Sequence, residues 1–162
     1  MGSREPRVSR TSLLLDSNLL LLLCIGSYDI DLIPTFKRVA DYSIRDYGIL
    51  AEFALGFRNL IATPHILTEV SNLANSLPSY LKAQWFGHFA GRIARIEERH
   101  IPASDLIGLT EFSTFGLTDT AITALAASTW LLTADNRHGA HLRRRQLCAL
   151  SLNELRVAYQ AG

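Results

Sequence analysis

An apolar run near the N-terminus, Leu13–Ile25, constrains most strongly what this chain can fold into. The polar residues Asp16, Ser17 and Asn18 interrupt the run, and only seven apolar residues follow them. A membrane-spanning helix needs about 20 apolar residues, so neither part of the run can cross a bilayer. Arginines at positions 4, 7 and 10 precede the run as they would in a signal peptide, but the polar break argues against export. We therefore expect a buried segment with no membrane anchor.

The same run predicts the first two elements of the fold. Leu13–Leu15 is a short apolar stretch that ends at Asp16, which is typical of a buried strand. Asn18–Cys24 then continues as a helix, with Gly26 as its predicted stop. Asp16 is therefore expected where a strand ends and a helix begins.

Length and composition indicate one globular domain. The chain has 162 residues, of which 48% are hydrophobic and 19% charged, with a formal net charge of +1. Such a length buries about two-thirds of the unfolded surface without a disulfide or structural metal. The two cysteines, Cys24 and Cys148, lie in apolar runs with no CxxC partner, as expected of reduced thiols in a cytoplasmic protein. We predict a domain over residues 11–162, preceded at 1–10 by a basic tail that is disordered or partly an expression remnant.

Short apolar runs alternate with helical patterns along the rest of the chain. Three further strands are predicted at 60–62, 130–132 and 147–150. Helices are predicted at 43–57, 63–74, 79–98, 104–112, 120–127, 138–145 and 153–159, with a break at Gly116 and a cap at Asn153 for the last. Strands separated by helices predict an α/β fold, a three-layer α/β/α sandwich around a short, mainly parallel sheet.

Four acidic residues fall at junctions between these elements. Asp16 and Asp135 follow strands, Asp119 begins a helix, and Glu69 lies about one turn into the helix after the second strand. Because ligand sites of such sheets lie at the carboxyl ends of the strands, we expect the four carboxylates to converge there. Clustered carboxylates repel one another unless they share protons or bind a cation, and Mg²⁺ or Mn²⁺ prefers oxygen ligands. Each acid taken alone could instead be a helix cap or a solvated side chain.

The blocks around these acids resemble the successive motifs of the PIN-domain ribonucleases. They are Leu-Leu-Asp16-Ser-Asn18-Leu-Leu, Thr63-Pro-His-Ile-Leu-Thr-Glu69-Val-Ser-Asn-Leu, Gly116-Leu-Thr-Asp119-Thr-Ala and Leu132-Thr-Ala-Asp135-Asn, in that order along residues 13–156.

The resemblance implies a PIN fold, divalent-metal-dependent cleavage of RNA phosphodiester bonds, and catalysis by Asp16, Glu69, Asp119 and Asp135. It also implies accessory polar roles for Asn18, Thr133 and Asn136. Thr133 either orients Asp16 or a water, or merely ends a strand. Many PIN proteins are toxins that an antitoxin peptide blocks, and many are homodimers. The segment Tyr28–Phe57 is longer here than in the compact toxins.

Two further features have two interpretations each. Arg137, Arg143 and Arg144 form either a solvated helix face or a set of phosphate contacts to RNA beside the acids. The apolar stripe of the predicted helix 79–98 belongs to the core, and any exposed edge of it would serve as a dimer or antitoxin surface.

The function predicted from the sequence is a metal-dependent endoribonuclease, and the toxin of a toxin–antitoxin pair is its narrower form. The alternatives are an RNA-processing nuclease without an antitoxin and a catalytically quiet PIN-fold binding or scaffold protein. A phospho-aspartate mechanism at Asp16 is disfavoured, because Asn18 stands where that class needs a second aspartate. The chain carries no Gly-rich phosphate loop, which disfavours nucleotide hydrolysis.

Overall fold

The computed structural model describes residues 11–145 and 147–162, and the predicted basic tail at 1–10 lies outside them. Five strands form one sheet in the order β3-β2-β1-β4-β5, and every pair of neighbours in it is parallel. The strands are β1 (Ser12–Leu15), β2 (Asn59–Ala62), β3 (Glu97–Glu98), β4 (Trp130–Thr133) and β5 (Ala149–Ser151).

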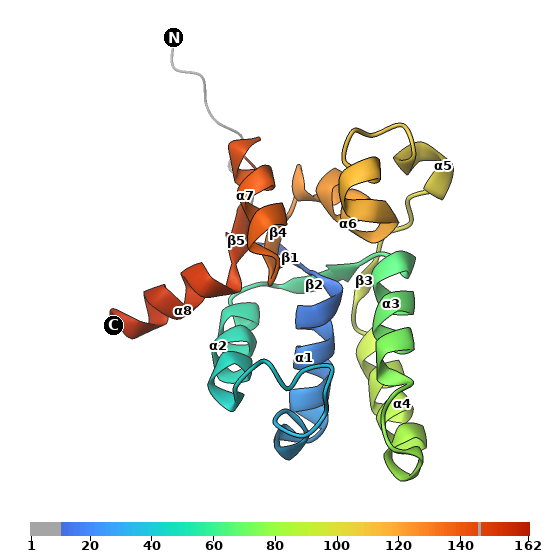
Figure 1. Cartoon of the computed structure of the whole chain (residues 1–162), viewed down its shortest axis with the longest axis vertical. Helices are drawn as coiled ribbons and strands as arrows, with labels where there is room; N and C mark the ends of the chain where they lie inside the picture. The colour runs from blue at the N-terminus through green and yellow to red at the C-terminus, as the bar shows by residue number, and fades with distance from the viewer. Residues whose placement is uncertain (1–10, 146) are drawn as a thin grey trace.

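Helices cover the sheet on both sides (Figure 1). They are α1 (Ser17–Tyr28), α2 (Ile44–Leu55), α3 (Pro64–Ala74), α4 (Ser79–Ile93), α5 (Ala103–Leu106), α6 (Phe112–Ala126), α7 (Asn136–Arg144) and α8 (Leu152–Gln160), with a 3-10 turn η1 (Ile30–Leu32). In Figure 1, α1 to α4 lie below the sheet and α5 to α7 above it. The predicted α/β/α sandwich with a short parallel sheet is confirmed.

Strand β1 and helix α1 form the centre of the molecule. All four residues of β1 are buried, and so are all the residues of α1 from Leu19 to Gly26. A helix that is apolar on every side is stable in water only when other elements surround it, and α1 contacts α2, α3 and α4. The apolar run that opens the sequence is thus the core of the fold. Within the described residues, no helix is long and apolar enough to span a membrane.

The sequence analysis predicted that α1 stops at Gly26, and this prediction is wrong. The helix runs on to Tyr28. The glycine is needed for close packing instead, because a Cβ atom at this position would lie 2.3 Å from the ring of Tyr47 on α2. A side chain there would push α2 away from the central helix.

The prediction of one helix over 79–98 was wrong at its C-terminal end. Helix α4 ends at Ile93, and Glu97–Glu98 forms the edge strand β3, which pairs with β2. The next backbone amide, that of Arg99, donates to the carbonyl of Ala62 at 2.9 Å. Backbone pairing with a neighbouring strand thus overrides a helical side-chain pattern. The periodicity of a sequence does not reveal such pairing.

Several other boundaries also differ from the prediction. The predicted helix over 104–112 is only the short α5, and α6 begins at Phe112. Helix α7 begins at Asn136 rather than at residue 138, and the last strand covers Ala149–Ser151 rather than 147–150. The cap of α8 is Ser151, in a capping box with Glu154, and not Asn153.

Gly116 breaks the chain as predicted. Its φ of 82° kinks α6, and the helix resumes immediately after it. Such a φ is strained for any residue with a Cβ, so a glycine fits this position best. The kink sets the start of the regular helix that carries Asp119.

Candidate active site

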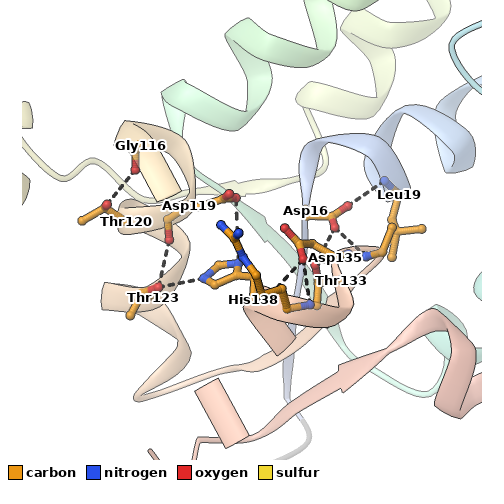
Figure 2. Close-up of polar contacts among 11 residues, drawn as sticks. Asp16, Leu19, Gly116, Asp119, Thr120, Thr123, Thr133, Asp135 and His138 are labelled. Carbon is orange, nitrogen blue, oxygen red and sulfur yellow. Dashed lines mark hydrogen bonds and ion pairs between the residues drawn. The ribbon is translucent and has the colours of Figure 1, made fainter. Parts of the chain in front are cut away.

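Asp16 lies at the carboxyl end of the central strand, where three donors hold it. Its Oδ1 accepts from the backbone N–H of Leu19 at 2.8 Å and caps α1. Its Oδ2 accepts from the hydroxyl of Thr133 at 2.7 Å and from the N–H of Ala134 at 2.6 Å. The side chain is a helix cap and is also tied to the end of the neighbouring strand β4 (Figure 2).

The pKa of Asp16 is nevertheless raised above its ordinary value. Burial is the main cause, and the charge of Asp135 adds to it, while the three hydrogen bonds act in the opposite direction. Donors without a positive charge thus do not compensate the loss of water around this carboxylate.

Thr133 joins Asp16 to Asp135. Its hydroxyl donates to Asp16, and the same oxygen accepts from the backbone N–H of Asp135 at 3.0 Å. Asp135 in turn caps α7, because its Oδ1 accepts from the N–H groups of Arg137 at 2.8 Å and His138 at 3.0 Å. Of the two interpretations of Thr133, the geometry supports the one in which it orients Asp16.

Asp119 faces this pair from α6 (Figure 2). Its pKa is raised to about 6, first by burial and then by the charges of Asp16, Glu69 and Asp135. Repulsion of this kind requires the other carboxylates to be close. Glu69, which is half-buried on α3, is therefore part of the same acidic cluster, together with Asp16, Asp119 and Asp135.

Within the described residues, no lysine or arginine forms an ion pair with any member of this cluster. Among the described residues, the one basic side chain within ion-pair distance of these acids is His138, whose Nδ1 lies 3.9 Å from Oδ1 of Asp119. Burial lowers the pKa of His138, so it is neutral at pH 7. The negative charge of the cluster therefore has no counter-ion in the described part of the protein.

The donor set suits a hard divalent cation, since it offers only carboxylate and hydroxyl oxygens. As placed, however, no three Asp, Glu, His or Cys side chains among the described residues converge closely enough to enclose a metal ion. Asp16 uses both oxygens, and Asp135 one, to accept hydrogen bonds from the protein. The acids thus lie near one another without forming a closed metal cage.

The accessory asparagines are less closely connected. Asn18 and Asn136 are exposed in the first turns of α1 and α7, beside the ends of β1 and β4. Within the described residues, neither forms a hydrogen bond to the four acids.

The three arginines predicted to contact RNA have different surroundings. Arg143 forms an ion pair with Glu154 on α8. Arg137 lies over the ring of Phe115, 5.4 Å from its centroid, and Arg144 lines a cavity beside that ring. Only Arg137 and Arg144 are therefore available to an external phosphate.

Sequence reasoning missed two residues near the cluster. His138 is fully buried, and its Nε2 lies 2.9 Å from the hydroxyl of Thr123. Tyr42 lies in the long segment after α1, and its pKa is raised to about 12, first by burial and then by the charge of Asp16. That segment has no periodic pattern, so no sequence signal placed Tyr42 beside the acids.

No protein-family model matches this chain, and a search of curated proteins finds no similar sequence.

Proposed function

We propose that this protein is a metal-dependent endoribonuclease in which Asp16, Glu69, Asp119 and Asp135 hold Mg²⁺ or Mn²⁺. The observation that carries the proposal is geometric: Asp16 and Asp135 follow the neighbouring parallel strands β1 and β4, Thr133 links them, and Asp119 faces them from α6. The acids meet at the carboxyl ends of parallel strands, where α/β proteins bind their ligands. Their uncompensated charge favours a cation.

Asp16 and Asp119 would have different roles in holding the cation. Asp16 is held rigidly by three donors and provides a fixed ligand oxygen. Asp119, with a pKa of about 6, is largely ionised at neutral pH and would lose its remaining proton when a cation binds. A bound divalent cation would supply an activated water and offset charge on the scissile phosphate. No protein nucleophile is needed.

The narrower parts of the proposal depend on the resemblance to PIN-domain ribonucleases. The resemblance supports RNA as the substrate and a homodimer as the working form, and the free cysteines Cys24 and Cys148 support the cytoplasm as the location. The resemblance also supports a toxin that an antitoxin protein neutralises. Expression of the wild-type chain should then arrest growth, and expression of Asp119→Asn should not. Normal growth with a soluble protein that is active in vitro would favour an RNA-processing nuclease instead.

A second candidate is a PIN-like protein that binds RNA without cutting it. The observation in its favour is that the described carboxylates do not form a closed metal cage. Such a protein would bind RNA equally well with Mn²⁺ and with EDTA, and Asp119→Asn would not impair that binding.

Cleavage of an unstructured single-stranded RNA separates the two candidates. We expect cleavage in Mn²⁺ or Mg²⁺, none in excess EDTA, and a loss of more than about a hundredfold for Asp119→Asn, because changes behind metal ligands already cost up to that much. Asp119→Asn is preferable to Asp16→Asn, since an amide at Asp16 would place an NH₂ group against one of three donors. Asp105→Asn, at an exposed acid on α5, is the matched control. Cleavage that persists in excess EDTA would refute the metal mechanism.

A further inference from the structure

A cavity of about 480 Å³ lies between the start of α6 and helix α7, next to the acidic cluster. Phe115, Arg137, His141 and Arg144 line its walls, and the buried Glu111 is at its base. We call it the α6–α7 pocket. Cavities of this size accommodate small organic molecules, and a single nucleotide is within that range.

The pocket is contiguous with the acidic cluster through two short connections. Phe115 immediately precedes the Gly116 kink, and its ring contacts that of His138, with centroids 4.9 Å apart. His138 faces Asp119, and Arg137 donates its N–H to Asp135. A molecule seated in the pocket would therefore be separated from Asp119 by Phe115 and His138, and from Asp135 by Arg137.

The charge of the pocket suits a phosphate group. Glu111 is already neutralised, because it pairs with Arg145 and its Oε1 lies 3.3 Å from Nε2 of His141. Among the described residues, Arg137 and Arg144 form no ion pair. The pocket thus presents two guanidinium groups, and guanidinium binds phosphate in a bidentate manner.

The pocket also offers an aromatic surface. The ring of Phe115 is half-buried, with the guanidinium of Arg137 at 5.4 Å and the ring of His141 at 5.3 Å from its centroid. An aromatic side chain beside arginine is the combination that proteins use to stack and hold bases of single strands.

We propose that the α6–α7 pocket binds one unpaired nucleotide of the RNA, adjacent to the bond that is cleaved. Its base lies against the edge of the Phe115 ring and the Arg137 guanidinium that covers the ring, and its phosphate lies against Arg144. This inference rests on the proposed ribonuclease function and adds to it a binding site for one unpaired base. A base held in a duplex cannot enter a cavity, because it is stacked between its neighbours.

The test measures binding without cleavage. Fluorescence anisotropy of a labelled, unstructured RNA 12-mer is recorded in EDTA, with the same strand in a duplex as the comparison. We expect the wild-type protein to bind the single strand more tightly. Phe115→Leu, which removes the ring and keeps an apolar side chain, should weaken binding of the single strand by roughly tenfold or more. It should affect duplex binding little.

Arginine variants provide a second measurement, which does not depend on replacing the half-buried ring of Phe115. Arg144 is exposed, so Arg144→Ala leaves the core intact. It should reduce the slope of log K against log salt by about 0.7, the value for one phosphate contact to a single strand. Arg143→Ala is the matched control, because Arg143 is on the same helix but pairs with Glu154 outside the pocket. It should change neither the slope nor the affinity.

The outcomes distinguish this inference from the proposed function. If wild-type protein cleaves RNA in Mn²⁺ while Phe115→Leu and Arg144→Ala bind like wild type, the pocket assignment is overturned and the nuclease stands. If the variants lose binding but wild-type protein never cleaves, the pocket assignment is supported and the nuclease fails. Equal affinity of wild-type protein for the single strand and the duplex would also overturn the pocket assignment.

Discussion

Two aspartates in this protein are almost equally exposed to solvent and behave in opposite ways. Asp16 is 7% exposed and Asp46 is 6% exposed. Burial raises the pKa of Asp16. At Asp46, hydrogen bonds from Arg156, with a smaller contribution from Ser43, outweigh burial and hold the pKa below its ordinary value. Both accept backbone N–H groups at helix N-termini. Two differences account for this: Asp46 has the arginine, and Asp16 lies deeper below the surface, so its carboxylate loses more hydration.

Arg156 reaches Asp46 with two guanidinium nitrogens, Nε to Oδ1 at 2.7 Å and Nη2 to Oδ2 at 2.9 Å. The pair joins α8 to α2, and Asp46 also completes the capping box of α2 with Ser43. Where a carboxylate fastens two helices, this chain provides a matching cation. It provides none in the described surroundings of Asp16 and Asp119, which is the basis for expecting a cation from solution.

Manganese should therefore bind at the acidic cluster and not at Asp46, and this binding should stabilise the folded protein. At about a hundredfold excess over its dissociation constant, a ligand that binds only the folded state adds about 2.7 kcal/mol. For a domain of this size, the melting temperature should rise by roughly 5–10 °C when EDTA is replaced by Mn²⁺. Thermal melts followed by circular dichroism measure this shift.

The same Asp→Asn change at the two sites sharpens this test. Asp119→Asn should lose most of the Mn²⁺ shift, because an amide is a poor ligand for a hard cation. Asp46→Asn should keep it in full, since Asp46 is committed to Arg156. A wild-type melting temperature that is the same in Mn²⁺ and in EDTA would show that the acids bind no cation.

Asp46→Asn should destabilise the fold by about 2 kcal/mol. Breaking a buried ion pair by removing one partner costs about 3–5 kcal/mol, and the Arg156 side chain, 34% exposed, regains part of its hydration. Urea denaturation at pH 7 measures the difference. A variant as stable as wild type would mean that the capping interactions alone hold Asp46.

The pH dependence of that penalty follows from the lowered pKa of Asp46. A group with a lowered folded pKa contributes stability above its unfolded value and loses it as pH falls through the folded value. The cost of Asp46→Asn should therefore be the same at pH 7 and pH 5 and should decline only below the ordinary value of 3.8. A penalty that already fades at pH 5 would contradict the assignment.

The sequence predicted the parts of the fold that local chemistry determines. The strand before Asp16, the helix starts near Ser43 and Thr63, and the break at Gly116 all lie where expected. Each depends on an apolar run, a capping side chain or a glycine, which acts within a few residues of itself. The grouping of the acids follows from strand order, because Asp16 and Asp135 come after neighbouring parallel strands.

The parts that sequence reasoning missed depend on contacts between distant segments. Glu97 and Glu98 become a strand only because β2 offers an unpaired edge. The neutral, buried state of His138 depends on Thr123 and Phe115, which approach it from α6. The partner of Asp46 is 110 residues away, and no local pattern identifies it.

Asp119→Asn should do the opposite of Asp46→Asn and stabilise the metal-free protein. Asp119 has a folded pKa of about 6, against an ordinary value of 3.8, so the folded state binds a proton more tightly than the unfolded state. The free energy of unfolding of the wild-type protein therefore falls as pH rises from about 4 to about 6 and then levels off. Asparagine resembles the protonated form and avoids this loss.

At pH 7 in EDTA, the gain from Asp119→Asn should be about 1–2 kcal/mol, a value reduced for solvent screening because the side chain is 31% exposed. The gain should shrink at pH 5 and disappear near pH 4, where wild-type Asp119 is itself protonated when folded. Urea denaturation of both proteins at the three pH values measures it, with Asp105→Asn as a neutral control. Equal stability at every pH would mean that Asp119 is not repelled by Asp16, Glu69 and Asp135. The argument for a cation at the acidic cluster would then lose its basis.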